Sequence, residues 1–292
     1  MRFYTMLREG REIPCASSDG QVLYPIPSVA SINDLISRGV LVDLESLKSA
    51  SENADDPLLK PLPLAEATLL APIPHPLQDV VCLGLNYASH REEAARFSDT
   101  AFGGERPYPI FFAKRVNTAP GPEGTIPSYP GLVEKLDYEC ELAVILGKDA
   151  FGVAPEQVKD YIFGYTVLND VSARTLQTRH KQWYFGKSLD GFTPMGPCIV
   201  TADEIAYPPA LAIRCRVGGE LRQDSNTENL LTTIDEIVSM LTQGMTLKAG
   251  TIIATGTPAG VGMGMQPPCF LKSGDKVECE IEGIGNLVNY VK

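Results

Sequence analysis

The sequence contains few histidines and no closely spaced cysteine pair, and this scarcity limits the metal sites that it can build. Its three histidines are His75, His90 and His180, and its seven cysteines are scattered without a Cys-x-x-Cys motif. Structural zinc sites take most of their ligands from closely spaced cysteine and histidine residues. We therefore expect neither a zinc knuckle nor a disulfide framework, and a reducing compartment suits the chain best.

The sequence also lacks an excess of basic residues and any long apolar run. Lys and Arg number 25 against 36 Asp and Glu, so the formal net charge is −11 and charge repulsion argues against a nucleic-acid partner. No apolar run approaches the roughly 20 residues that span a bilayer. The first residues resemble neither a secretory signal nor an Arg-rich transit peptide. The sequence predicts a soluble protein with no membrane partner, in the cytoplasm in preference to the mitochondrion.

Proline is concentrated in one short region of the chain. Six prolines fall between Pro57 and Pro76, and proline both fixes φ and removes a backbone donor. This composition is typical of a connector. The sequence therefore predicts a small N-terminal domain at residues 1–60, a connector at 61–77 and the main domain at 78–292.

Strand signals outnumber helix signals in the main domain, which predicts an α+β, strand-rich fold. The segments with strand-like alternation or β-branched and aromatic content are 138–146, 161–168, 211–217 and 276–282. Gly218-Gly219 follows the third of these as a two-residue hairpin turn. One helix is well marked, because Thr233 and Glu236 have capping-box spacing and Gly244 lies at the expected end.

The acids Asp137, Glu139 and Glu141 form the most informative pattern in the chain. Strand period two would put all three on one face. On an exposed strand they would simply be solvated. Apolar residues on both sides favour a buried strand instead, where unpaired acids cost several kcal/mol each. A bound cation would resolve that conflict.

Asp170 is a third oxygen ligand that could join such a site. It follows another apolar strand, although an aspartate there could equally cap a helix. The set Glu139, Glu141 and Asp170 would suit Mg²⁺, Mn²⁺ or Ca²⁺ better than a thiophilic metal. Three carboxylates around a divalent ion leave one surplus negative charge, and Lys187 is our first candidate to balance it, with Arg174 second.

Two further segments carry groups that chemistry could use. His90 and Glu93 would meet on one face of a helix and form an oriented base, or alternatively an exposed salt bridge. The glycine-rich loop 255–262 follows a predicted strand at 251–254 and lets backbone amides approach an anion. It matches neither the Walker nor the dinucleotide motif. A carboxylate or an enolate oxygen is a better guest than phosphate.

Four segments, taken together and in this order, resemble the signature blocks of the fumarylacetoacetate hydrolase family. They are Asp137-x-Glu139-x-Glu141, Asn169-Asp170-Val171-Ser172-Ala173-Arg174, Gly186-Lys187-Ser188-x-Asp190-Gly191 and Thr255-Gly256-Thr257-Pro258-x-Gly260. The resemblance runs from about residue 79 to residue 292. It implies a mixed β-roll catalytic fold that is usually paired as a homodimer.

The resemblance also implies roles for individual residues. Glu139, Glu141 and Asp170 match metal ligands for Mg²⁺ or Mn²⁺, with Ca²⁺ as a substitute. His90 and Glu93 match a base dyad on a segment that closes as a lid. The positions that match binders of the substrate's carboxylate and oxo groups are Arg174, Gln177, Lys187 and Thr257.

These expectations together predict an enzyme that acts on a small 2-oxo acid or 1,3-dicarbonyl acid through an enolate that the metal stabilises. A dyad that only moves protons gives a tautomerase, and one that activates water gives a carbon–carbon hydrolase. Residues 181–183 and 267–275 resemble a branch associated with oxaloacetate tautomerisation, which we rank above acylpyruvate or fumarylacetoacetate hydrolysis and oxaloacetate decarboxylation.

Two noncatalytic alternatives remain open at this stage. A metabolite sensor could use the same pocket, and a structural Ca²⁺ site could use the same acids, but His90 and Lys187 would then have no task. The stretch 94–106 is longer than in the branch just described and would cover the pocket. That difference leaves the identity of the substrate open.

Overall fold

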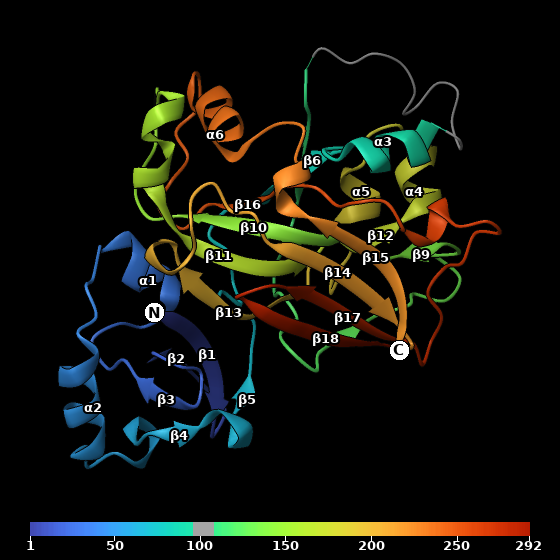
Figure 1. Ribbon diagram of the computed structural model, residues 1–292. Coiled ribbons are helices and arrows are strands. Elements are labelled where there is room, and N and C mark those ends of the chain that lie inside the picture. The colour runs from blue at the N-terminus through green and yellow to red at the C-terminus, as the bar shows by residue number, and fades with distance from the viewer. Residues whose placement is uncertain (96–107) are drawn as a thin grey trace.

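The protein is described by a computed structural model that covers residues 1–95 and 108–292 (Figure 1). Most of the stretch expected to cover the pocket, residues 96–106, lies outside these ranges. Two large sheets, one separate two-stranded pair and a few short helices make up the described part, as the α+β prediction expected. None of the helices in the described ranges is long and apolar enough to cross a membrane.

A large mixed sheet forms the centre of the molecule. Its strand order is β4-β3-β2-β1-β13-β11-β10-β16-β6-β7 with β5 beside β1, and only the β16–β6 contact is parallel. The strands of the main domain in it are β6 (Val80–Gly84), β7 (Ile110–Lys114), β10 (Cys140–Leu146), β11 (Ile162–Asn169), β13 (Met195–Thr201) and β16 (Ile252–Ala254).

The N-terminal strands extend this sheet through the pairing of β1 with β13. They are β1 (Arg2–Arg8), β2 (Arg11–Ser17), β3 (Val22–Pro25), β4 (Leu62–Pro63) and β5 (Thr68–Leu69). β4 and β5 lie within the proline-rich connector and pair with β3 and β1. The division of the chain into domains at residues 60 and 78 stays a prediction.

A second, five-stranded sheet has the order β15-β14-β17-β18-β8. Its strands are β8 (Thr125–Ile126), β14 (Ala212–Val217), β15 (Glu220–Asn226), β17 (Lys276–Ile281) and β18 (Gly285–Val291). The strands β9 (Leu136–Asp137) and β12 (Ser172–Ala173) form a separate short pair.

The helices are short and lie around the sheets. The α-helices are α1 (Ile32–Ser37), α2 (Leu44–Glu52), α3 (Ala88–Ala95), α4 (Arg174–Arg179), α5 (Tyr184–Lys187) and α6 (Ile234–Thr242). The 3₁₀ turns are η1 (Pro57–Leu59), η2 (Leu64–Glu66), η3 (Pro155–Tyr161), η4 (Ala202–Glu204), η5 (Thr227–Asn229) and η6 (Gly262–Gly264). In Figure 1, α3, α4 and α5 gather at one end of the large sheet.

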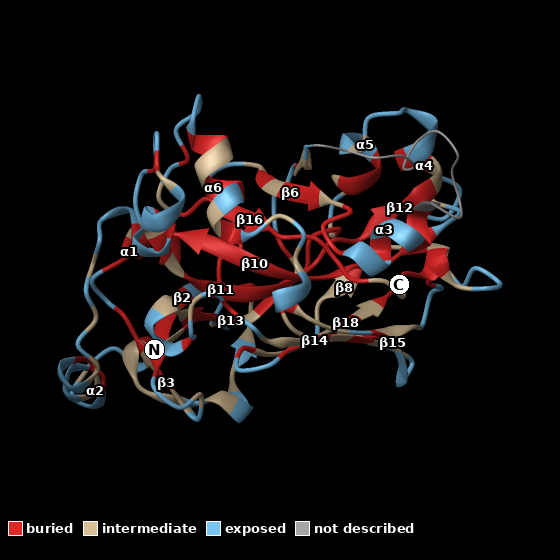
Figure 2. Cartoon of the chain, turned by 45° about the horizontal axis from the view of Figure 1, so that its top comes forward, coloured by how far each residue is buried: buried red, intermediate tan, exposed pale blue. Residues whose placement is uncertain are grey.

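Strand β10 is buried along its whole length because both of its faces are covered (Figure 2). Leu142 and Val144 belong to one hydrophobic core, whereas Ala143 and Ile145 belong to another. This explains why the sequence of this strand is apolar on both faces. Glu141 is therefore carried into the interior by a strand whose other side chains are nearly all apolar.

The register of the large sheet brings several strand ends to the same place. Cys140 at the start of β10 lies opposite Asn169 at the end of β11. Ala143 lies opposite Ala254 at the end of β16, and β6 runs parallel to β16. The segments that follow β6, β11 and β16 therefore leave the sheet beside the start of β10. These are the segments that carry the predicted site residues.

Several local predictions are confirmed and one is corrected. The Thr233 capping box and the Gly218-Gly219 hairpin are present, and β17 alternates between buried and half-buried residues. The expected strand at 138–146 begins later, at Cys140, because the chain changes pairing partner between β9 and β10. Asp137 consequently belongs to β9 and does not continue the row of acids.

His75 links the N-terminal strands to the main domain and gives a pH-dependent prediction. Its Nε2 lies 3.0 Å from Glu12 Oε1 and its Nδ1 lies 3.1 Å from the Asn117 carbonyl oxygen. Both contacts require the protonated ring. The Asn117 carbonyl, followed by Glu12, accordingly raises the pKa of His75.

The pKa of histidine in the unfolded chain is about 6.5. We expect the two His75 contacts to stabilise the fold fully below that pH and to lose their effect as pH rises through the raised pKa of the folded state. The His75→Gln variant should therefore lower the thermal midpoint at about pH 5 and much less at about pH 9, by an amount worth under about 1 kcal/mol because the pair is exposed. A difference from wild type that stays constant with pH would contradict this assignment, and Glu12→Gln should weaken the pH dependence.

Candidate active site

Three buried carboxylates converge at the start of β10, and we call Glu139, Glu141 and Asp170 the acidic triad. Each offers an oxygen, and these oxygens lie within 4.8 Å of one another. Backbone pairing sets this geometry, because the amide of Asp170 donates to the Glu139 carbonyl at 2.8 Å. The Asn169 side chain accepts from the Glu139 amide at 3.0 Å. Asp170 does not cap a helix, so the alternative use considered for it is not the one observed.

Cationic side chains contact the triad from several directions. Lys187 Nζ lies 2.6 Å from Glu139 Oε2 and 2.7 Å from Asp170 Oδ2. Arg174 Nη1 lies 2.7 Å from Glu139 Oε1. Lys114 Nζ lies 2.5 Å from Asp170 Oδ1, and both of these side chains are fully buried. The structure thus brings both predicted cations to the triad and adds Lys114, which sequence reasoning missed.

The two glutamates of the triad have opposite electrostatic environments. Burial opposes ionisation of Glu139, but Lys187 and then Arg174 outweigh it and hold the pKa of this carboxyl well below its usual range. Burial, with Asp170 and Glu139 adding to it, raises the pKa of Glu141 well above its usual range. Glu141 accepts a hydrogen bond from the Gly256 amide at 2.8 Å. A negative charge on Glu141 would therefore be the least compensated in the triad, and its neutral form is favoured unless a cation is bound.

The buried charges of this region do not cancel, and this imbalance tests whether a divalent cation fits. Five carboxylates are buried here, namely the triad, Asp137 and Glu93, against the three cations Lys114, Arg174 and Lys187. Glu93 contacts His90, and Glu141 is left as the carboxylate without an ion pair among the described residues. A hard divalent ion prefers carboxylate oxygens, and a buried charge without a partner is costly. The three carboxylate donors and the unpaired Glu141 both fit such an ion, and Lys187 lies beside two of the three carboxylates.

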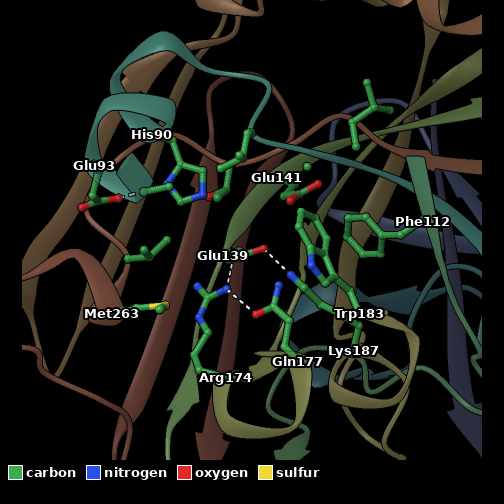
Figure 3. Close-up of a pocket in the computed structure, with 16 residues that line it drawn as sticks. His90, Glu93, Phe112, Glu139, Glu141, Arg174, Gln177, Trp183, Lys187 and Met263 are labelled. Carbon is green, nitrogen blue, oxygen red and sulfur yellow. Dashed lines mark hydrogen bonds and ion pairs between the residues drawn. The ribbon is translucent and has the colours of Figure 1, made fainter. Parts of the chain in front are cut away.

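His90 and Glu93 form a buried pair on α3, one helical turn apart. His90 Nδ1 lies 3.0 Å from Glu93 Oε2, and each residue exposes 8% of its surface. Glu93 Oε1 also accepts from the Gly260 amide at 3.0 Å. The exposed salt bridge that the sequence left open is therefore not what forms. In Figure 3 the His90 ring lies over the region between the Glu93 and Glu139 labels.

One pocket joins the dyad to the triad. It is lined on its polar side by the two dyad residues, Glu139, Glu141, Arg174, Gln177, Lys187 and Thr257. Its apolar side includes Leu85, Phe112, Trp183 and Met263. Asp170 does not line the pocket and lies behind it, held by the two lysines. The structure therefore brings every predicted site residue either to this pocket or to its inner wall.

Arg174 and Gln177 lie one turn apart on α4 and face the pocket together (Figure 3). Arg174 Nη1 donates to Gln177 Oε1 at 3.1 Å, and Arg174 Nε donates to Asp137 at 2.8 Å. Arg174 Nη2 is buried without a hydrogen-bond partner among the described residues. A buried guanidinium nitrogen in that state is suited to a carboxylate that enters the pocket.

The glycine-rich loop directs its amides at carboxylates of the chain itself. Gly256 donates to Glu141 and Gly260 to Glu93, while Gly262 and the next residue donate to Asp137. The Thr257 hydroxyl donates to the Cys140 carbonyl and accepts from Gln223. The loop was predicted to hold an anion, and the anions that these amides contact are the side chains of the site.

The aromatic side of the pocket was not predicted from sequence. Phe112 and Trp183 meet edge to face with ring centroids 5.1 Å apart, and Lys187 Nζ lies 5.1 Å from the Phe112 centroid. A β-carbon at Gly84 would approach the Trp183 ring to 2.3 Å, so the indole fills the space over this glycine. The apolar segment of β7 is the sequence signal that could have drawn attention to Phe112 and to Lys114 at its end.

Comparison with known proteins agrees with the predicted resemblance. Residues 79–292 match the pattern described as "Fumarylacetoacetate (FAA) hydrolase C-terminal". Over 228 residues the chain is 44% identical to "Oxaloacetate tautomerase YisK" of Bacillus subtilis. This alignment covers 78% of this chain and 74% of that protein. Over 249 residues it is 41% identical to "Oxaloacetate tautomerase Fahd2a, mitochondrial" of Rattus norvegicus, covering 85% and 76%. That relative confirms the predicted branch, which is the one of fumarylacetoacetate hydrolase domain-containing protein 2.

A solved structure extends the similarity to the whole chain. The "Fumarylacetoacetate hydrolase (EaFAH)" of Exiguobacterium antarcticum superimposes with a TM-score of 0.84 at 37% identity, covering 100% of this chain and 99% of that one. The match therefore includes the N-terminal strands that the family pattern does not reach. On these grounds the chain is an enzyme that belongs to the fumarylacetoacetate hydrolase family.

Proposed function

We propose that this enzyme binds Mg²⁺ or Mn²⁺ at the acidic triad and interconverts the keto and enol forms of oxaloacetate. The observation that carries the proposal is the shared pocket, in which the buried His90–Glu93 dyad faces the triad. The names of the relatives at 44% and 41% identity support oxaloacetate as the substrate. Membership of an enzyme family argues against the metabolite-sensor alternative. A structural Ca²⁺ site would instead raise thermal stability without Mg²⁺ supporting turnover.

Arg174 and Gln177 are proposed to hold the substrate by its carboxylate. Arg174 Nη2 is buried without a partner in the described residues, and Nη1 is already oriented by Gln177 and Glu139. Asp137 also accepts a hydrogen bond from Nε of the same guanidinium. An arginine fixed in this way presents its remaining donor in one direction, which orients the bound acid for reaction.

His90 is proposed to move the proton that tautomerisation requires. Its Nδ1 faces Glu93, so a proton on Nδ1 leaves Nε2 as the acceptor. Nε2 would take a proton from the carbon beside the carbonyl and return it in the reverse direction. The Lys187 ammonium would stabilise the negative charge that develops on oxygen and can supply a proton to it. A bound divalent cation would supply additional positive charge for the same oxygen.

A carbon–carbon hydrolase is the second candidate, because EaFAH resembles the chain over its full length. In that case the dyad would activate water in place of a carbon-bound proton. Decarboxylation of oxaloacetate is the third outcome compatible with the same groups. We also propose that the enzyme is a homodimer in the cytoplasm, as expected from the family resemblance and from the sequence.

The first functional prediction concerns the reaction. Enol oxaloacetate supplied with Mg²⁺ or Mn²⁺ should lose its ultraviolet absorbance while total oxaloacetate is conserved. His90→Gln should lower kcat/KM by about 100-fold or more, as expected for removal of a general base. Glu141→Ala should abolish metal-dependent turnover while the chain stays folded. A chelator should act on wild type as Glu141→Ala does.

Product analysis distinguishes the candidates in the same experiment. Pyruvate with carbon dioxide would make the enzyme a decarboxylase, and two acids from acetylpyruvate or fumarylpyruvate would make it a hydrolase. Either result would replace the tautomerase proposal. Full activity of Glu141→Ala would contradict the metal assignment whatever the product.

The second prediction uses Lys114, whose ammonium compensates Asp170 inside the fold. Lys114→Met adds one uncompensated buried charge, which should destabilise the metal-free protein by about 3 to 5 kcal/mol. Saturating Mn²⁺ should therefore raise the thermal midpoint of this variant by more than it raises that of wild type. The exposed Lys159→Met is the matched control. Equal Mn²⁺ shifts in Lys114→Met and wild type would contradict the charge-balance argument.

A further inference from the structure

Gly264 lies against the Glu93 carboxylate, and a β-carbon at this position would overlap that carboxylate where it now stands. A β-carbon built at position 264 would lie 1.9 Å from Glu93 Oε1 and 2.0 Å from its Cδ. Gly264 is buried, and its φ is not among the positive values of the chain. Backbone freedom therefore does not explain a glycine here. A glycine is needed here because the Glu93 carboxylate occupies the space that a β-carbon would take.

The Glu93 carboxylate fills that space and is held there by two hydrogen bonds. Oε1 accepts from the Gly260 amide and Oε2 contacts His90 Nδ1, each at 3.0 Å. Gly260 is itself constrained, because a β-carbon on it would approach the Arg222 carbonyl oxygen to 1.9 Å. The carboxylate is thus seated between α3 and the turn η6 that contains Gly264.

Hydrogen bonds to Asp137 fix the position of η6. This fully buried carboxylate accepts from the Gly262 amide at 2.7 Å and from the Met263 amide at 2.9 Å. It also binds Arg174 Nε at 2.8 Å. Because these contacts immobilise the turn, a side chain added at position 264 would displace Glu93 and leave η6 in place.

We propose that Gly264 is a positioning residue whose missing side chain keeps Glu93 on His90 and thereby decides which ring nitrogen of His90 carries the proton. The inference rests on the dyad role given under the proposed function. Glu93 is the end of a flexible side chain, so the fold can accommodate its displacement. The dyad cannot, because the carboxylate must leave both His90 and Gly260 to make room.

The test is Gly264→Ala, examined by imidazole ¹⁵N NMR and by turnover of enol oxaloacetate. Wild type should show His90 with its proton on Nδ1, and the variant should lose that preference. With only three histidines in the chain, His90→Gln identifies the signal. We expect kcat to fall by about 10- to 100-fold, with KM within about threefold because Arg174 and Gln177 keep their places.

Gly244→Ala is the matched control for the same substitution elsewhere. Gly244 does not have a positive φ, and a β-carbon there would meet no atom within 4 Å. In the Gly244→Ala variant, the His90 NMR signal and kcat should equal those of wild type. The double variant Gly264→Ala with Glu93→Asp is the rescue, because the shorter acid makes room for the new methyl group. It should recover part of both the His90 signal and kcat relative to Gly264→Ala alone.

The proposal is overturned if Gly264→Ala keeps the wild-type tautomer and kcat, or if the double variant is no better than the single one. Failure of both Gly264→Ala and the double variant to fold would also overturn it, because the shorter acid should relieve the overlap. If wild type does not turn over enol oxaloacetate, the proposed function fails while the NMR comparison still decides the role of Gly264.

Discussion

The need to compensate negative charge inside the protein governs this structure. Glu139, Glu141 and Asp170 are buried together, and such a cluster is unstable unless cations and hydrogen-bond donors surround it. Lys114 forms an ion pair with Asp170 and Lys187 forms one with Glu139. The glycine-rich loop donates a backbone amide to Glu141. Glu141 has no ion pair among the described residues, and this is the reason that a divalent cation fits the site.

The fold supplies the positions from which this compensation acts. Strand β10 is apolar on both faces, so it can carry Glu141 into the interior, and the register with β11 sets Asp170 beside it. The loop after β16 then serves both halves of the site, because Gly256 binds the triad and Gly260 binds Glu93. Through Asp137, the same region also fixes Arg174. The proposed roles in substrate binding, proton transfer and metal binding thus all depend on one short loop.

The parts of the site that the sequence predicted are those with short, local patterns. The His90–Glu93 pair follows from helical spacing, and the α6 capping box from Thr233 and Glu236. Asp137 was grouped with Glu139 and Glu141 because strand alternation cannot reveal that the chain changes pairing partner before Cys140. Lys114 was missed because its partner, Asp170, is distant in sequence and only the sheet brings them together. The same holds for the contact between Gly264 and Glu93.

Anomalous X-ray diffraction from a crystal grown with Mn²⁺ would show whether the acidic triad holds a divalent metal. If the triad binds the metal, an anomalous peak should lie within about 2.0 to 2.6 Å of one oxygen from each of Glu139, Glu141 and Asp170. Lys187 should remain beside the peak. A map with no peak among these three carboxylates, with Lys187 still bridging Glu139 and Asp170, would contradict the account.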